Sequence, residues 1–169
     1  MFVLGIDPGL TRCGFGALER SASKDVPYRA LVAGVIETDA DESLERRLGI
    51  VSTEIELLLD EVSPAVVVVE RIFFQSNVRT AISVAQVSGV VIAAAARRGL
   101  EVCQFTPNEV KEAVVGHGGA SKSQVQAMIT RLCGLSEPPK PPDVADALAL
   151  AACYLTSERL RAAIGAAAR

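Results

Sequence analysis

The chain has 169 residues, half of them hydrophobic and 22% charged, which is typical of a single globular domain with a substantial core. Its longest apolar runs, such as residues 64–69, are far too short to cross a bilayer, and no basic segment precedes the apolar start. The composition therefore argues against a membrane partner and against a secretory signal.

The cysteines and the charge distribution give two further expectations. The four cysteines share no C-x-x-C spacing and lie among apolar residues, so we expect buried thiols and a cytoplasmic protein. The net charge of −3 is uneven: residues 37–61 hold nine acidic and two basic side chains, whereas the rest of the chain holds 11 acidic and 15 basic ones. This asymmetry is compatible with a polyanion bound on one side, and equally with a solvated helix face.

Three strands are expected in the first forty residues. Apolar segments cover residues 2–7, 13–19 and 29–37, and their short connections predict an antiparallel meander. The first strand ends on the ionisable Asp7, directly before a Pro-Gly turn. Because a buried carboxylate without a partner is costly, Asp7 is either an incidental turn residue or has a cationic partner.

The remaining elements alternate helices with strands. Apolar residues recur every three or four positions between residues 44 and 59, which predicts a helix capped by Ser43. Small and β-branched residues at 65–69 predict a buried parallel strand ending in Glu70. The elements expected next are a helix at 78–98, a strand at 102–105, a short helix from Pro107, a helix at 121–133 and a helix from about Asp143.

This order predicts an α/β domain in which helices flank a mixed sheet. Residues 158–169 follow the last apolar pattern, and we expect them to form a flexible tail. The domain itself is expected to span residues 1–157.

Four acidic residues occupy positions suited to chemistry. Asp7 and Glu70 end strands expected at the centre of the sheet, so both should emerge at the same carboxyl edge. Asp143 and Asp146 lie three residues apart, on one helix face. Converging carboxylates repel unless a divalent cation binds them, and ligands that are all oxygen suit Mg²⁺ or Mn²⁺. Two such ions about 4 Å apart can activate water and stabilise the leaving oxygen of a phosphodiester.

Each of these acids also has a purely structural interpretation. Asp7 fits a turn before Pro-Gly, and Glu70 could pair with Arg71 or Arg79. The other two acids suit the start of a helix, where a carboxylate can cap the backbone or interact with the helix dipole. These interpretations remain open when each acid is taken singly.

Four sequence blocks favour the functional interpretation. They read GIDPGLTRCGFG at 5–16, VVERIFFQSN at 68–77, VKEAVVGHGGASKSQVQ at 110–126 and DVADALA at 143–149. In this order and spacing the blocks resemble the RuvC family of Holliday junction resolvases, within the RNase H-like superfamily. The resemblance implies an RNase H-like five-stranded sheet, with three antiparallel meander strands and two parallel strands.

The resemblance also implies roles for individual residues. The family carries its metal ions, here expected to be two Mg²⁺ with Mn²⁺ as a substitute, on acids at the positions of Asp7, Glu70, Asp143 and Asp146. Lys111 and Lys122 match two lysines that act near the scissile phosphate. For Lys111 the alternative is a solvated helix face, and for Lys122 an ordinary residue at a helix start.

Other residues are expected to contact DNA. Phe73 matches a family aromatic that stacks on a base near the crossover, unless it packs beneath its own loop. Ser121 can cap its helix and donate a hydrogen bond to the DNA backbone. Arginines that could reach a phosphate are Arg12, Arg71, Arg79, Arg97 and Arg98.

The function implied by the resemblance is metal-dependent, symmetric nicking of two strands of a four-way DNA junction, in recombination and repair. A homodimer is also implied, with the small-residue face of the helix at 78–98 as a candidate interface, together with the branch-migration partners RuvA and RuvB. One alternative is a junction-binding module with an inactive site. Another is a nucleotide-binding fold of the actin and sugar-kinase class, which also has a G-I-D-x-G strand but needs two lobes.

Overall fold

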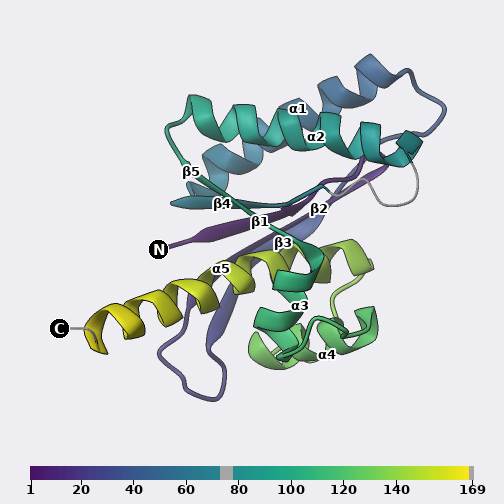
Figure 1. Ribbon diagram of the computed structural model, residues 1–169. Coiled ribbons are helices and arrows are strands. Elements are labelled where there is room, and N and C mark those ends of the chain that lie inside the picture. Colours follow the sequence, from purple (N-terminus) through teal and green to yellow (C-terminus); the bar gives the residue numbers. More distant parts are fainter. Residues whose placement is uncertain (73–77, 168–169) are drawn as a thin grey trace.

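The computed structural model describes the backbone of residues 1–72 and 78–167, and the side chains of residues 1–72 and 81–158. Its centre is a five-stranded sheet (Figure 1). The strands are β1 (Val3–Asp7), β2 (Arg12–Arg20), β3 (Tyr28–Glu37), β4 (Val66–Glu70) and β5 (Glu101–Phe105). They follow the spatial order β3-β2-β1-β4-β5, with an antiparallel meander on one side and parallel β1, β4 and β5 on the other. The predicted mixed sheet is confirmed.

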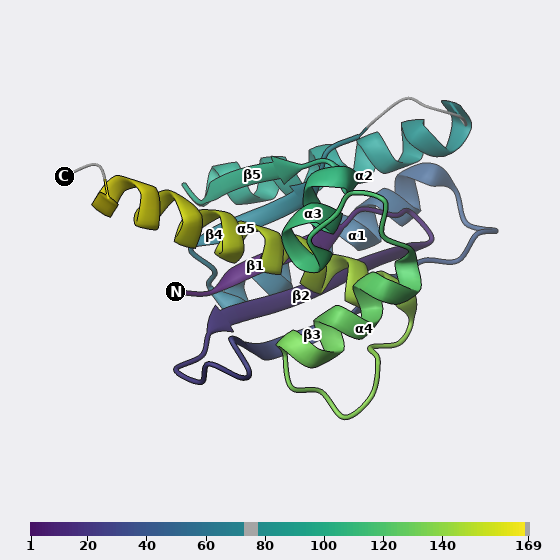
Figure 2. The ribbon, with the colours of Figure 1, turned by 60° about the horizontal axis from the view of Figure 1, so that its bottom comes forward.

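Helices cover both faces of the sheet. The helices are α1 (Leu44–Val62), α2 (Val78–Arg97), α3 (Pro107–Val115), α4 (Lys122–Leu132) and α5 (Pro142–Ala167). α1 and α2 lie on one face, and α3, α4 and α5 lie on the other (Figures 1 and 2). Because successive strand side chains point to opposite faces, Val3 and Val66 pack toward α3–α5, whereas Leu4 and Val67 pack toward α1 and α2. The central strands are therefore buried on both sides, as their continuous apolar runs predict.

α5 lies very close to the middle of the sheet. A Cβ on Gly5 would overlap the carbonyl oxygen of Ala147 and lie 2.9 Å from the backbone nitrogen of Ala151. Glycine on the strand and alanine on the helix let the two backbones approach without intervening side chains. This close approach brings the first turns of α5 to the edge of the sheet where β1 ends.

Capping boxes hold the first turns of α3 and α4. Thr106 accepts a hydrogen bond from the N–H of Glu109, whose carboxylate accepts one from the N–H of Thr106. Ser121 and Gln124 make the same reciprocal pair at α4, so the predicted capping role of Ser121 is confirmed. Ser43 stands at the N-cap of α1, but its side chain makes no capping hydrogen bond.

The last helix is longer than expected. α5 continues to Ala167, through most of the segment 158–169 for which the sequence predicts a flexible tail. This segment is rich in alanine, the residue with the highest helix propensity, so the helix does not stop where the apolar pattern stops. Among the described residues, no helix is both long and apolar enough to span a membrane.

Three of the four cysteines, Cys13, Cys133 and Cys153, are buried, and Cys103 is half-buried. Burial raises the pKa of the thiols of Cys13 and Cys153 to about 12, and that of Cys133 to about 11. These three side chains therefore stay protonated and behave as small apolar residues of the core.

Candidate active site

Two carboxylates emerge together from the middle of the sheet. β1 and β4 are parallel neighbours with Ile6 opposite Val69, so the residues that follow, Asp7 and Glu70, leave the sheet at the same edge. The preceding residues of both strands are buried, which makes this edge the first place where a polar side chain can reach solvent. The structure thus places the two acids side by side, as the strand pattern predicts.

α5 adds two further acids to this edge. Asp143 is the second residue of α5, and Asp146 follows nearly one turn later. Asp146 lines the same hollow as Asp7 and Glu70, whereas Asp143 lies beside that hollow, with its Oδ2 atom 3.8 Å from Nε of Arg12. The four predicted acids therefore gather at one edge, although only three of them face a common space.

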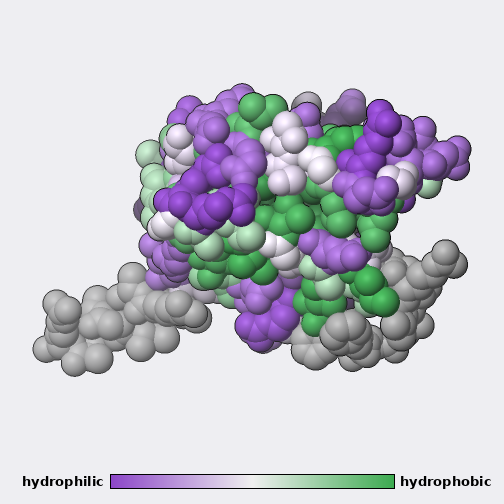
Figure 3. Space-filling view, turned by 90° about the horizontal axis from the view of Figure 1, so that it is seen from above, coloured by the Kyte–Doolittle hydropathy of each residue, from purple (hydrophilic) through white to green (hydrophobic). Residues whose placement is uncertain are grey.

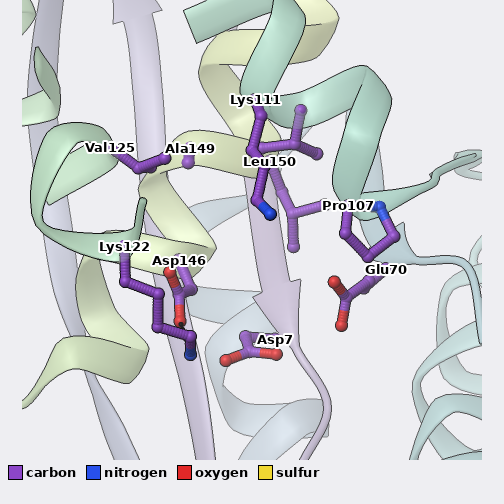
Figure 4. Close-up of a pocket in the computed structure, with 10 residues that line it drawn as sticks. Asp7, Glu70, Pro107, Lys111, Lys122, Val125, Asp146, Ala149 and Leu150 are labelled. Atoms are coloured by element: carbon purple, nitrogen blue, oxygen red, sulfur yellow. Dashed lines mark hydrogen bonds and ion pairs between the residues drawn. The ribbon is translucent and has the colours of Figure 1, made fainter. Parts of the chain in front are cut away.

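That space is a hollow of about 280 Å³ built from β1, β4, α3, α4 and α5 (Figure 4). Figure 4 shows Asp7 between Glu70 on one side and the neighbouring side chains of Lys122 and Asp146 on the other. Lys111 reaches the hollow from α3. The apolar part of the wall consists of Pro107, Val110, Val125, Ala149 and Leu150. Both predicted lysines therefore line the same hollow as the acids.

Burial and mutual repulsion oppose full ionisation of this site. The pKa of Asp7 is raised to about 7, first by burial and then by three neighbouring carboxylates, while the ammonium of Lys122 acts in the opposite direction. Burial, followed by the charge of Asp146, also raises the pKa of Glu70, and Lys122 and Lys111 partly offset this. The pKa of Lys122 is raised in turn, chiefly by the charge of Asp146. The hollow therefore favours additional positive charge.

The hollow suits a hard divalent cation, because its negatively charged groups are carboxylates. Their oxygen atoms can act as metal ligands, and a bound cation would relieve their repulsion. The ligand sphere is not closed, however. Within residues 1–72 and 81–158, no three acidic, histidine or cysteine side chains are grouped tightly enough to hold an ion. Instead, Nζ of Lys122 lies 3.1 Å from Oδ2 of Asp146. The residues fit a metal in type and place, but Asp146 is engaged by a lysine.

The residues that are predicted to contact DNA differ in their surroundings. Arg12 lies beside Asp143, and its side chain is 53% exposed. Arg71 is exposed and donates a hydrogen bond to the backbone oxygen of Gln104, so it does not pair with Glu70. Ser121 caps α4 and shares a hydrogen bond with Ser123. Phe73 lies outside the described residues, as does the side chain of Arg79, whose backbone belongs to the first turn of α2.

Arg97 and Arg98 do not belong to this edge. Arg98 binds Asp60 at 2.7 Å and also contacts Glu56, which pairs with Arg97 as well. These contacts join α2 to α1 on the face of the sheet opposite to α3–α5 (Figure 1). The two arginines pair with acids of α1 away from the hollow, and a contact with phosphate stays a prediction for both.

The apolar wall of the hollow was not predicted, although the sequence contains a signal for it. Ala149 and Leu150 follow Asp146 by three and four residues, and Val125 follows Lys122 by three. Residues at these spacings share one face of a helix, so each charged residue marks the face on which its apolar neighbours lie. A helical projection centred on the acids and lysines would have identified these wall residues.

Comparison with known proteins agrees with this architecture. Residues 3–154 match the family model for the crossover junction endodeoxyribonuclease RuvC. The chain belongs to the RuvC family. Its predicted nuclease function is thereby confirmed at the level of the family, and the sugar-kinase-like alternative loses its support.

The similarity extends over most of the chain. The RuvC of Streptomyces griseus is 52% identical over 170 residues, covering 98% of this chain and 82% of that protein. The RuvC of Leifsonia xyli is 54% identical over 152 residues, covering 90% and 72%. The structure of Thermus thermophilus RuvC is 34% identical, with a TM-score of 0.87 over 95% of this chain and 96% of that one. The same relative, solved in complex with a Holliday junction substrate, also aligns with a TM-score of 0.87.

Proposed function

We propose that the chain binds four-way DNA junctions and hydrolyses two of their strands with the help of two divalent cations, Mg²⁺ or in its place Mn²⁺. One observation carries this proposal: a hollow at the carboxyl edge of the sheet combines three carboxylates with Lys111 and Lys122, in a chain of the RuvC family. The substrate is inferred from the Thermus thermophilus relative, which was solved with a Holliday junction and is 35% identical.

The four carboxylates would hold the metal ions. Such ions, when bound, activate the attacking water and stabilise the leaving oxygen of the phosphodiester. Asp7 is suited to a fixed ligand position, because the rest of β1 is buried on both faces and Pro8-Gly9 turns the chain away immediately afterwards. Its raised pKa favours a proton in the metal-free protein, so metal binding is expected to release that proton.

The two lysines would act on the DNA. Lys111 and Lys122 come from different helices and face the same hollow, so they can place positive charge on two sides of one phosphate group. Positive charge at this position attracts the backbone and offsets the negative charge that develops during hydrolysis. Capping boxes at Thr106 and Ser121 hold the first turns of α3 and α4, the helices that carry these lysines.

Further DNA contacts are proposed around the hollow. The exposed side chains of Arg12 and Arg71 and the hydroxyl of Ser121 are available at or near this edge. For Phe73 the support is its position in the sequence, three residues after Glu70, where an aromatic side chain can stack on a base of a distorted junction. Arg79 is retained as a phosphate contact on the same basis of sequence position.

We also propose that two copies of the chain act together, because a two-fold dimer presents two hollows to the two equivalent strands of a junction. α2 and α1 expose apolar side chains on one face, with Ile82 51% and Leu57 58% accessible. Figure 3 shows hydrophobic groups reaching the surface on this face, between hydrophilic regions.

Residues 1–157 would form the nuclease domain of each copy. The proposed partners are RuvA and RuvB, and the proposed location is the cytoplasm.

A cleavage assay tests the proposed function. The purified chain is incubated with a labelled synthetic mobile junction and either Mg²⁺, Mn²⁺ or EDTA, and the strands are separated on a denaturing gel. We expect paired nicks at symmetric positions with either metal and none with EDTA. Asp7→Asn should still bind the junction but should not cut it. Cutting in EDTA, or undiminished cutting by Asp7→Asn, would contradict the proposed metal site, and binding without any cutting by the wild type would indicate an inactive module.

A further inference from the structure

The four carboxylates at this edge of the sheet fall into two classes according to their partners. The two aspartates of α5 each have a basic neighbour: Asp146 binds Lys122 at 3.1 Å, and Asp143 lies 3.8 Å from Arg12. The strand acids Asp7 and Glu70 form no ion pair among the described side chains. The helix acids are therefore neutralised by cations of the protein itself, whereas the strand acids are not.

In the Lys122–Asp146 pair, the backbone of the lysine is held in place, whereas its ammonium group can move. Lys122 is the first residue of α4, and the capping box of Ser121 and Gln124 holds the backbone at this point. The Lys122 side chain is nevertheless 80% exposed, whereas that of Asp146 is 28% exposed. The ammonium can therefore leave Asp146 for another anion by rotating its aliphatic stem, without any movement of α4.

Asp146 cannot bind the ammonium group of Lys122 and a metal ion at full strength at the same time. Its Oδ2 atom accepts the charge-assisted hydrogen bond from Lys122, and the ammonium would repel a divalent cation bound to the same carboxylate. A phosphate of bound DNA offers the ammonium a new anionic partner near the hollow. If the ammonium group of Lys122 moves to that phosphate, Asp146 becomes free to bind a metal ion when the DNA binds.

We propose that Lys122 is an internal counter-ion of Asp146 in the DNA-free protein and exchanges this carboxylate for a phosphate of the junction, so that metal binding and junction binding strengthen each other. The inference rests on the proposed function and adds a coupling between its two ligands. By linkage, the factor by which the junction increases metal affinity equals the factor by which the metal increases junction affinity. Lys122 thereby acts as a positioning residue toward the metal site before it acts on DNA.

The test compares two lysines of the same hollow. Lys122→Met and Lys111→Met each remove one positive charge near the carboxylates and keep the apolar stem. Among the described residues, however, only Lys122 forms an ion pair with one of the hollow's carboxylates. Lys111→Met therefore measures the general effect of a lost charge. Binding of Ca²⁺, which takes the same oxygen ligands, is measured by calorimetry on the full chain without DNA.

We expect Lys122→Met to bind Ca²⁺ two- to fivefold more tightly than Lys111→Met does, which is about the strength of an exposed ion pair. Junction affinity is then measured by fluorescence anisotropy with and without Ca²⁺, with a denaturing gel to verify that the strands are intact. The enhancement by Ca²⁺ should be at least twofold smaller in Lys122→Met than in the wild type, and unchanged in Lys111→Met. Thermal unfolding of both variants serves as the control for folding.

Two results would overturn the proposal: equal Ca²⁺ affinities of the two variants, or an unchanged enhancement in Lys122→Met. Either result, together with normal cutting by the wild type, would leave the proposed function standing and reduce Lys122 to a phosphate contact. A wild type that fails to cut junctions with Mg²⁺ or Mn²⁺ would instead contradict the proposed function itself. The two failures are therefore distinguishable.

Discussion

Gly14 and Asp143 are packed so closely that no side chain fits between them. A Cβ on Gly14 would overlap the carbonyl oxygen of Asp143 and lie 2.7 Å from its carbonyl carbon. Gly14 is also the partner of Asp7 in the pairing of β1 with β2. One glycine thus lies between the strand that carries Asp7 and the helix that carries the other aspartates, and it limits the distance between them.

This contact leads to a prediction for Gly14→Ala. The added methyl group must push the start of α5 away from the sheet, which costs about 1–3 kcal/mol of unfolding free energy. A displacement of about 1 Å at a catalytic centre reduces rates by roughly 100-fold, so we expect a loss of this order in single-turnover cutting of a junction. Urea unfolding should show that most of the protein remains folded.

The matched control is Gly49→Ala in α1, where a Cβ would meet no atom within 4 Å. This variant should cut normally and gain about 0.5–1 kcal/mol of stability, because alanine is the better helix residue. Normal cutting by Gly14→Ala would show that the contact with α5 does not set the geometry of the site.

The raised pKa of Asp7 predicts how the stability of the metal-free protein depends on pH. The pKa of this carboxyl is about 4 in the unfolded chain and about 7 in the folded one. Between these values the folded state binds more protons than the unfolded state, so the contribution of Asp7 to stability falls as the pH rises from about 4 to about 7. Asp7→Asn removes this ionisation.

We therefore expect Asp7→Asn to be more stable than the wild type above pH 7, by about 2–4 kcal/mol, and about equally stable near pH 4. Urea unfolding of both proteins in EDTA, at several pH values between 4 and 8, measures the difference. A difference that does not change with pH would mean that Asp7 titrates normally in the folded protein.

The capping box of α4 links stability to the position of Lys122. Ser121→Ala removes the side-chain acceptor for the N–H of Gln124, which should cost about 1 kcal/mol of unfolding free energy. We also expect slower cutting, because Lys122 is the next residue and the first turn of α4 would fray. Ser121→Asn keeps a capping side chain and should retain most of the stability. If the asparagine variant cuts as slowly as the alanine variant, the hydroxyl of Ser121 acts on DNA directly rather than through the cap.

The positions of Lys111 and Arg98 predict that only the first of them contributes to DNA binding. Lys111→Met should weaken junction binding and reduce the dependence of log affinity on log salt by about one unit, as expected for a lost phosphate contact. Arg98→Met should leave both quantities unchanged, because Arg98 binds Glu56 and Asp60 on the opposite face of the sheet. Titrations at several salt concentrations measure both variants. A reduced salt dependence in Arg98→Met would place DNA on the α1–α2 face.

Much of the fold could be predicted because the relevant signals are local. The apolar runs before Asp7 and Glu70 indicate strands buried on both faces, and the first polar residue after such a run must lie at the edge of the sheet. The three-residue spacing of Asp143 and Asp146 likewise places both on one helix face. The pairing of Arg98 with Asp60 of α1 could not be predicted in the same way, because it depends on how two helices far apart in the sequence pack together.

The sequence by itself thus determined the order of strands and helices, the identity of the four acids and two lysines, and the likeness to the RuvC family. Only the tertiary structure decided how closely these groups approach. The packing of α5 on Gly5 and Gly14 brings Asp146 to Asp7, and the position of α4 then places Lys122 against Asp146. The reason is physical: a side chain's burial, its pKa and its ion pairs depend on atoms that come from distant parts of the chain, and packing alone sets those distances.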